Sequence, residues 1–105
     1  MVDPAPEPTF TGVYPAEYPG EAEFANVVYE DGDIAILGAN LTDDMQVSLL
    51  KDGAEVAFTK GETTPTSITG HIGGTLAVLD EFAFALKTAD GRTVGTATIY
   101  CNEHP

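Results

Sequence analysis

Residues 81–100, EFAFALKTADGRTVGTATIY, decide the fold because they predict a β-hairpin with a defined register. Asp90-Gly91 suits a two-residue type I′ turn, in which both central residues take positive φ. Pairing outward from this turn gives an apolar face, with Leu86 opposite Gly95, Phe84 opposite Ala97 and Phe82 opposite Ile99. The other face is mixed, with Lys87 opposite Val94, Ala85 opposite Thr96, Ala83 opposite Thr98 and Glu81 opposite Tyr100. One apolar face and one mixed face are typical of a half-buried antiparallel pair.

A second turn of this kind, Asp52-Gly53, predicts a hairpin between residues 45–51 and 54–60. One face then holds Lys51 opposite Ala54, Leu49 opposite Val56, Val47 opposite Phe58 and Met45 opposite Lys60. The reverse face holds Leu50 opposite Glu55, Ser48 opposite Ala57 and Gln46 opposite Thr59. Further strands are expected at residues 9–14, 24–29, 34–37 and 67–72, and no stretch of eleven residues keeps a helical apolar period. The sequence therefore predicts an all-β sandwich or small barrel of about seven antiparallel strands.

The length of 105 residues predicts one domain with its own hydrophobic core. Residues 1–8 contain three of the seven prolines, so residues 1–9 are expected to form a flexible acidic arm before a domain at residues 10–105. The single cysteine, Cys101, is expected to be a buried, inert thiol rather than a surface thiol that joins two copies. The expected core consists of apolar residues on the inner faces of the strands: Val13, Val28, Ile34, Ile36, Val47, Leu49, Val56, Phe58, Ile68, Ile72, Phe82, Phe84, Leu86 and Ile99.

The net charge of −13 is distributed unevenly, since residues 1–44 hold ten acids and no Lys or Arg. Such a surface repels the phosphate backbone of nucleic acids, and the chain has neither a long apolar run nor a basic amphipathic helix for a membrane. One interpretation is that the charge keeps the protein soluble and suppresses self-association. The other is that the acidic surface docks onto a basic partner, or that the protein requires salt or divalent cations. The N-terminal residues have no secretory-signal pattern, so we expect the protein to act where it is made or as a module of a longer chain.

Four segments together resemble the IPT/TIG group of immunoglobulin-like domains. They are Val13-Tyr14-Pro15, the segment DIAILGANL at residues 33–41, the segment TSITGHI at residues 66–72, and the hairpin at residues 82–94. The resemblance implies an immunoglobulin-like β-sandwich, in which Gly38 permits a turn and Leu41 caps the core. The chain departs from this family at residues 16–25, where an acidic segment replaces a shorter Gly-rich turn.

Members of this family usually occur as modules of receptors, transcription factors or bacterial surface proteins. A small, acidic chain without a signal sequence resembles instead the immunoglobulin-like proteins that decorate bacteriophage capsids or tails. This second resemblance rests on size and context, because a fold does not determine function.

The supply of histidine limits catalysis and metal binding. His71 lies in an alternating strand, where we expect it to face solvent or a neighbouring strand. Cys101 and His104 offer two ligands near the C-terminus, whereas a zinc site needs three or four. A triad of Ser48 or Ser67 with His71 and an Asp is formally possible, but the chain has neither a nucleophile elbow nor a Gly-rich phosphate loop. We therefore expect no enzymatic activity, no cofactor and no metal site.

Two acidic clusters, residues 30–33 and Asp43-Asp44, lie at opposite ends of one expected strand. That strand spans about 13 Å, so the clusters do not share a calcium ion through it, and each alone has too few oxygens. We interpret both clusters as turn-forming acids. The triplet Asn40-Leu41-Thr42 matches a glycosylation site, but we interpret Asn40 as a turn residue with left-handed φ.

Two functions remain as hypotheses. The first is a virion structural protein, assembled in the host cytoplasm, that decorates a bacteriophage capsid by adhesion to a capsid or other virion protein, with self-association as a further possibility. The second is a carbohydrate- or protein-recognition module of a multidomain surface protein. For the first hypothesis, one edge of the sandwich or the N-terminal arm is expected to dock on the capsid. For the second, the tyrosines of residues 14–29 are the expected contacts, because aromatic rings stack on sugars and anchor interfaces. Each of the possible partner contacts is an aromatic residue of the N-terminal third. These residues are Phe10, Tyr14, Tyr18 and Tyr29.

Overall fold

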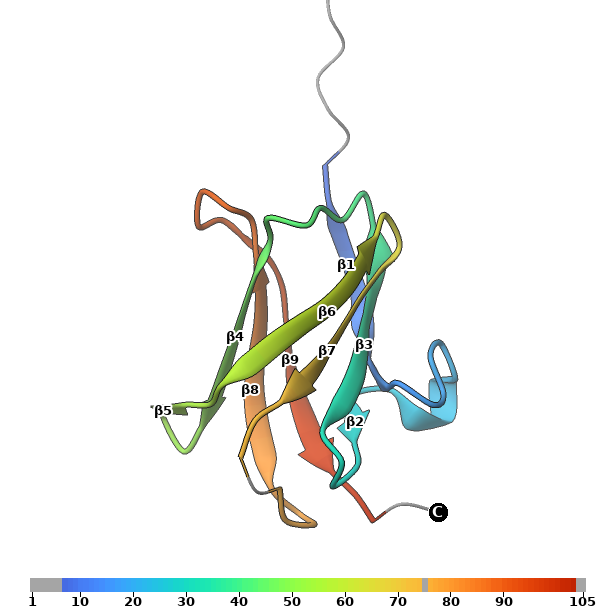
Figure 1. The fold of residues 1–105 in the computed structure, drawn as a ribbon, viewed down its shortest axis with the longest axis vertical. Helices are drawn as coiled ribbons and strands as arrows, with labels where there is room; N and C mark the ends of the chain where they lie inside the picture. The colour runs from blue at the N-terminus through green and yellow to red at the C-terminus, as the bar shows by residue number, and fades with distance from the viewer. Residues whose placement is uncertain (1–6, 75, 104–105) are drawn as a thin grey trace, which may run out of the picture.

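The computed structural model describes residues 7–74 and 76–103. In this part of the chain nine strands form two sheets that pack face to face, and one short 3-10 helix lies between β1 and β2 (Figure 1). The elements are β1 (Thr9–Pro15), η1 (Ala22–Phe24), β2 (Val27–Val28), β3 (Asp33–Ala39), β4 (Gln46–Lys51), β5 (Ala54–Glu55), β6 (Phe58–Thr64), β7 (Ser67–Ile72), β8 (Glu81–Lys87) and β9 (Thr93–Cys101). The described residues include no helix with the length and apolar character of a membrane span.

The order of the strands is that of an immunoglobulin-like sandwich. The four-stranded sheet has the order β1-β3-β7-β6, and the five-stranded sheet has the order β2-β9-β8-β4-β5. These orders correspond to strands A-B-E-D and G-F-C of the immunoglobulin fold. The predicted fold class is confirmed, but the predicted number of strands is corrected, because the two-residue strands β2 and β5 extend the second sheet. Strand β2 also pairs with β9 in parallel, whereas all neighbours were expected to be antiparallel.

The β8–β9 hairpin has the predicted register over most of its length. The six pairs from Glu81 with Tyr100 to Leu86 with Gly95 are confirmed. The pair Lys87 with Val94 is wrong, because the register shifts after Leu86 and Lys87 pairs with Thr93. The two-residue turn is also wrong.

The turn of this hairpin is a five-residue loop, residues 88–92, closed by a hydrogen bond from the Thr88 amide to the Arg92 carbonyl (2.8 Å). Gly91 has a φ of 93°, whereas Asp90 does not take positive φ. The hydroxyl of Thr88 explains the longer loop, since it donates to Asp90 and accepts from the Arg92 amide (3.1 Å). A side chain that makes hydrogen bonds to two groups of a longer loop stabilises that loop relative to a two-residue turn.

The second predicted turn is confirmed, since Asp52 and Gly53 have φ values of 52° and 82°. The hairpin itself is much shorter than predicted. The pairs Lys51 with Ala54 and Leu50 with Glu55 form, and the Val56 amide still donates to the Leu49 carbonyl (2.9 Å). The chain then crosses to the other sheet.

After the crossing, β6 pairs with β7 and not with β4, so the four predicted pairs from Ser48 with Ala57 to Met45 with Lys60 are wrong. Phe58 pairs with Ile72, and its ring lies so close to Gly70 that a Cβ there would stand 2.2 Å from Cζ. A glycine at this position of β7 therefore makes room for the crossing strand. Lys60 still reaches the residue before β4, since its Nζ donates to the carbonyl of Met45 (2.8 Å).

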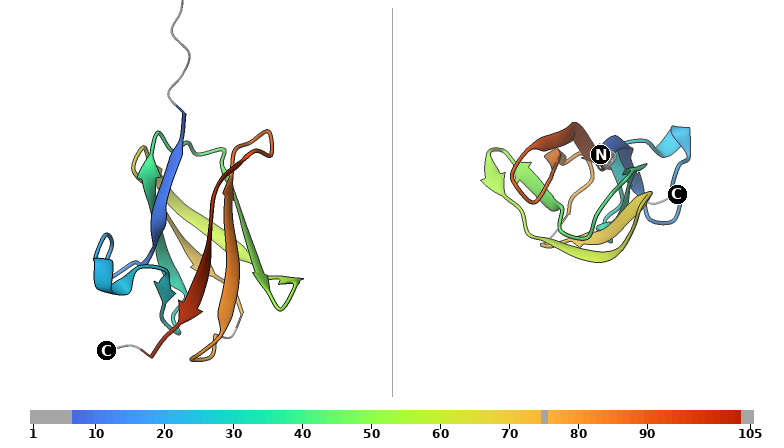
Figure 2. Two further views of the ribbon diagram at one scale, coloured as in Figure 1. Left: turned by 180° about the vertical axis from the view of Figure 1, so that it is seen from behind. Right: turned by 90° about the horizontal axis from the view of Figure 1, so that it is seen from above.

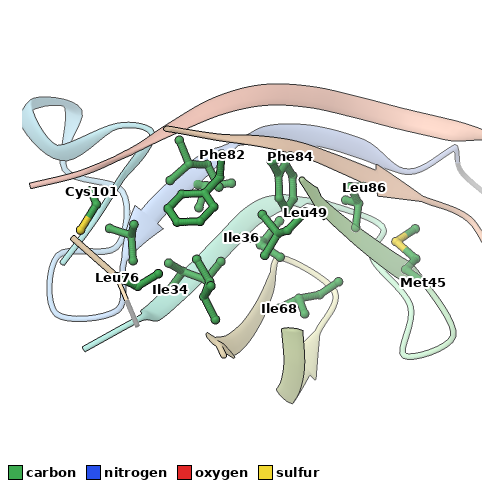
Figure 3. Packing of buried hydrophobic residues seen from close by; sticks show 14 of the residues in the cluster. Ile34, Ile36, Met45, Leu49, Ile68, Leu76, Phe82, Phe84, Leu86 and Cys101 are labelled. Carbon is green, nitrogen blue, oxygen red and sulfur yellow. The ribbon is translucent and has the colours of Figure 1, made fainter. Parts of the chain in front are cut away.

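The core fills the space between the sheets (Figure 3). All fourteen predicted core residues belong to it: eleven are buried, whereas Val47, Val56 and Phe58 are partly buried and pack against the rest. Leu41 is buried, as the family resemblance implied. Cys101 is buried as predicted, and burial raises the pKa of its thiol, with the acids Asp80, Glu30 and Asp31 adding to the effect. The sequence did not predict the burial of Met45 and Leu76.

The predicted arm over residues 1–9 falls mostly outside the described residues, and Thr9 already belongs to β1. Glu7, near the start of the described residues, contacts the domain. The side-chain amide of Asn40 donates to the Glu7 carbonyl (3.1 Å), and Arg92 lies 3.9 Å from the Glu7 carboxylate.

Replacing Phe84 by Ala should lower the free energy of unfolding by about 3–5 kcal/mol, because the ring is 2% exposed and stacks on Phe10. Urea denaturation followed by circular dichroism measures this change. The control is Tyr100→Ala, which truncates an aromatic residue that is 45% exposed and should cost less than about 1 kcal/mol. A cost below 1 kcal/mol for Phe84→Ala would contradict the core position of this ring.

Candidate protein-binding surfaces

Three of the four predicted contact residues take part in packing. Phe10 is partly buried, and its ring stacks on Phe84 with the centroids 5.4 Å apart. The same ring lies over Gly95, where a Cβ would approach it to 2.5 Å. Tyr14 and Tyr29 are 8% and 3% exposed. These rings therefore hold the sandwich together and offer little surface to a partner.

The fourth residue, Tyr18, belongs to an aromatic cluster with Phe24 and Tyr29. The rings of Tyr18 and Phe24 stack with centroids 4.5 Å apart and planes 15° apart. Tyr29 meets both rings edge-on, at 6.3 Å from Tyr18 and 6.4 Å from Phe24. Burial, followed by the nearby Tyr18 and Glu17, raises the pKa of Tyr29. Phe24 was not predicted as a contact residue, although its position as an aromatic residue beside a Glu-rich loop is a signal for one.

The stacked pair is carried by residues 16–25, which we call the aromatic segment. This segment connects β1 to β2 and projects from the side of the sandwich (Figure 1). Successive turns order its backbone, since the Tyr18 amide donates to the Pro15 carbonyl (2.9 Å) and the Phe24 amide donates to the Glu21 carbonyl (2.9 Å). Glu17, Glu21 and Glu23 are exposed here, and the segment has no Lys or Arg. The aromatic segment is thus an ordered projection with two stacked rings and three negative charges.

A second surface is the outer face of the five-stranded sheet, where β9, β8 and β4 run side by side (Figure 2). Its outward side chains form cross-strand rows, one with Leu50, Ala83 and Thr98 and the next with Ser48, Ala85 and Thr96. We call these six residues the neutral face. They line a shallow hollow and carry no charge, which is unusual in a chain with a net charge of −13. Charged residues border this face: Glu81 and Lys87 stand at the two ends of the central strand, and Glu55 of β5 pairs with Leu50 in the same cross-strand row.

The outer face of the other sheet carries His71, which is exposed and lies beside Asp33 of β3, with Nδ1 2.9 Å from Oδ1. The prediction that His71 faces solvent or a neighbouring strand is confirmed. The structure does not assemble the formally possible triad, because Ser48 lies on the outer face of the opposite sheet, while Ser67 and His71 lie near opposite ends of β7.

The acidic clusters form turns, as predicted. The Asp33 amide donates to Asp31 (3.2 Å) in the turn after β2, and Thr42 donates to Asp44 in the turn before β4. Asn40 has a left-handed φ of 56°, as predicted for a turn residue. Across residues 7–74 and 76–103, no group of three or more His, Cys, Asp or Glu side chains is arranged to hold a metal ion. His104, which the sequence paired with Cys101 as one of two possible metal ligands, lies outside the described residues.

The turn before β8 displays a strained apolar residue. Leu79 is 83% exposed and has a φ of 79°, which a bulky side chain rarely adopts. Its amide donates to the Cys101 carbonyl (2.8 Å), and the Asp80 amide donates to the Ala77 carbonyl (3.0 Å). The Asp80 carboxylate accepts from the Ala77 amide and from Lys51, both at 3.0 Å. These bonds hold the turn in its strained form and lower the pKa of Asp80, the Ala77 amide most of all and Lys51 next.

Comparisons of the sequence with protein-family models and with curated proteins found no match. The family resemblance noted from the sequence therefore stays a prediction, and function is inferred from the surfaces themselves.

Replacing Leu79 by Gly should raise the free energy of unfolding by about 0.5–1 kcal/mol. Glycine relieves a left-handed conformation that costs about 1–2 kcal/mol, and this gain exceeds the entropy cost of about 0.5–1 kcal/mol for ordering a glycine. Thermal and urea denaturation measure the change. Val78→Gly is the matched control in the same turn, and it should destabilise because Val78 does not take positive φ. Equal destabilisation by both variants would contradict the strain at Leu79.

Replacing Asp80 by Asn should lower stability at neutral pH, and the difference from the natural protein should shrink as the pH falls below about 4. The folded protein lowers the pKa of Asp80 below its ordinary value of about 3.9, so this carboxylate stabilises the fold above that value and loses its effect as it is protonated. Urea titrations at pH 7, 5, 4 and 3 test this, with the exposed Asp52→Asn as the control. A difference that does not change with pH would rule out the charge of Asp80 as the cause.

Proposed function

We propose that the protein is a non-enzymatic adhesion module of a virion, a bacteriophage capsid-decoration protein that binds another virion protein through the aromatic segment. The stacked pair of Tyr18 and Phe24 on an ordered projection is the observation that carries this proposal. Aromatic side chains are enriched among the residues that dominate binding energy in interfaces. A segment already ordered by its own backbone hydrogen bonds loses little entropy on binding.

The charge of the aromatic segment indicates the kind of surface that it fits. Glu17, Glu21 and Glu23 are exposed on the same segment as the two rings, so the partner is expected to present an apolar pocket with Lys or Arg at its rim. Rim charges act mainly on the association rate, so binding should slow at high salt. The rest of the acidic surface keeps unbound copies apart in solution.

The same pair of rings supports a second candidate function, recognition of a carbohydrate by a module of a multidomain surface protein. Aromatic rings pack against the apolar faces of sugars, and Tyr18 also carries a hydroxyl for hydrogen bonding. The surrounding glutamates favour a protein with a basic surface over a neutral or acidic glycan. A glycan array separates the two candidates, because sugar recognition predicts specific hits that are lost in Tyr18→Ala.

The double variant Tyr18→Ala/Phe24→Ala should lose about tenfold or more in affinity for purified virus particles, since truncating interface aromatics typically costs more than 1 kcal/mol each. The particles are purified from a virus that lacks the gene for this protein, and bound protein is measured by co-sedimentation. The variant Glu17→Gln/Glu21→Gln/Glu23→Gln should slow association and reduce its salt dependence.

The matched control for charge is Glu55→Gln/Glu62→Gln/Glu103→Gln, which removes three exposed acids elsewhere and should bind as the natural protein does. Circular dichroism confirms that each variant is folded. Unchanged particle binding by the aromatic variant would remove the aromatic segment from the mechanism, and no binding by the natural protein would contradict the proposal itself.

A further inference from the structure

We propose that two copies of this chain pair face to face through the neutral face, with Glu81 of each copy against Lys87 of the other. This association goes beyond the proposed function and does not depend on it. It follows from the order of the outward residues on β8, which are Glu81, Ala83, Ala85 and Lys87.

The outward side of β8 is complementary to itself when its direction is reversed. An acid stands at one end of the row, a base stands at the other, and two alanines lie between them. A two-fold axis between the copies, in the interface plane and perpendicular to the strands, lays one β8 antiparallel over the other. Each Glu81 then meets Lys87 of the other copy, so the symmetric interface has two ion pairs. Self-complementarity of charge is what identifies a second copy as the occupant.

The middle of the neutral face is a shallow hollow lined largely by small side chains, which leave room for close approach. Ala83 and Ala85 lie between Leu50 and Ser48 of β4 on one side and the threonines of β9 on the other. Small side chains allow two sheets to pack at a separation of about 10 Å. At one end, Tyr100 lies beside Glu81 and is half-exposed, so the same axis places its ring over the start of β9 in the other copy. The contact thus combines a smooth centre with an aromatic residue at each end.

The internal ion pairs leave Lys87 for this role. Lys51 pairs with Asp80, Arg92 pairs with Asp90, and Lys60 donates to backbone carbonyls. Within residues 7–74 and 76–103, Lys87 makes no ion pair. Lys87 is also the base at the end of β8 on the neutral side of the five-stranded sheet.

The acids of the chain also favour this face over others. They lie mainly in the aromatic segment and in the turns at both ends of the sandwich, away from the neutral face; Glu55 of β5 is an exception, because it pairs with Leu50. Two chains of charge −13 therefore meet with least repulsion here, because salt at about 0.15 M screens charges beyond about 8 Å.

The size of the face sets the strength of the association. Three strands about 4.8 Å apart, over the seven-residue length of β8 at about 3.4 Å per residue, cover an area of roughly 14 Å by 24 Å. A stable interface buries about 800 Å² on each partner, so we expect a reversible dimer with a Kd of roughly 10–500 µM.

Sedimentation equilibrium of the purified chain from 10 µM to 2 mM tests the proposal. The natural protein should dimerise reversibly. Glu81→Lys and Lys87→Glu should each weaken dimerisation about tenfold or more, because each replaces two attractive contacts by two repulsive ones. The double variant Glu81→Lys/Lys87→Glu should restore it, since the exchanged charges still face each other and the net charge is unchanged.

Glu81→Lys gives the sharpest single result, because it reduces the net negative charge and would strengthen any association limited by overall repulsion. Ala85→Arg places a bulky charge at the centre of the face and should abolish the dimer, whereas Thr59→Arg on the outer face of the other sheet should not. Circular dichroism verifies folding of all variants. A natural protein that stays monomeric to 2 mM, or a double variant that fails to recover, overturns the proposal. Loss of particle binding in Ala85→Arg without any dimer of the natural protein would also overturn it, because the face would then serve another partner.

Discussion

The sandwich depends on burial of the apolar face of the β8–β9 hairpin against the opposite sheet. Figure 3 shows Phe82 and Phe84 pointing toward Ile34 and Ile36, and all four side chains are almost completely buried. The chain has one cysteine, so no disulfide joins the two sheets and packing is the main contact between them. Phe10 of β1 stacks on Phe84 of β8 and covers one end of this core. Cys101 lies buried near the other end as a small apolar residue. Because the hairpin fixes which side of β8 faces the core, it also fixes the outward row from Glu81 to Lys87. The surface that we propose for self-association is therefore a consequence of the core.

The strand pattern was predictable wherever a turn and two alternating strands are local in the sequence. The β8–β9 register follows from the letters because a slip by one residue would expose Phe82 and Phe84. The crossing of β6 to the other sheet was not predictable in this way. The alternation of apolar and polar residues in 54–60 fits a long hairpin with β4 and a new strand beside β7 equally well. What decides between them is the space over Gly70 for the ring of Phe58, a contact between segments that are distant in sequence.

The candidate sites were less predictable than the fold for a related reason. Aromatic residues in the N-terminal third were correctly singled out as a group, but burial divides them. Tyr14 and Tyr29 occupy packed positions, while Tyr18 pairs with Phe24 on a loop whose backbone follows no regular period. Loop geometry of this kind depends on individual turns, here those that begin at Pro15 and Tyr18. The mixed outer face of the hairpin was visible in the sequence, yet its neutrality has meaning only once the acids are seen to gather in the loops and turns.

The two proposed surfaces are connected through the topology of the five-stranded sheet. The aromatic segment leads into β2, the edge strand beside β9, so it lies at one flank of the neutral face and outside it. A two-fold axis perpendicular to the strands keeps the strand order and sets β2 of one copy over β2 of the other. Both aromatic segments then lie at the same flank of the dimer and point along the axis in the same direction. A flat lattice approached along that axis would meet two binding segments at once. Once one segment is bound, the second binds as an intramolecular step, so a weak dimer of weakly binding modules is held more firmly than either contact alone would allow.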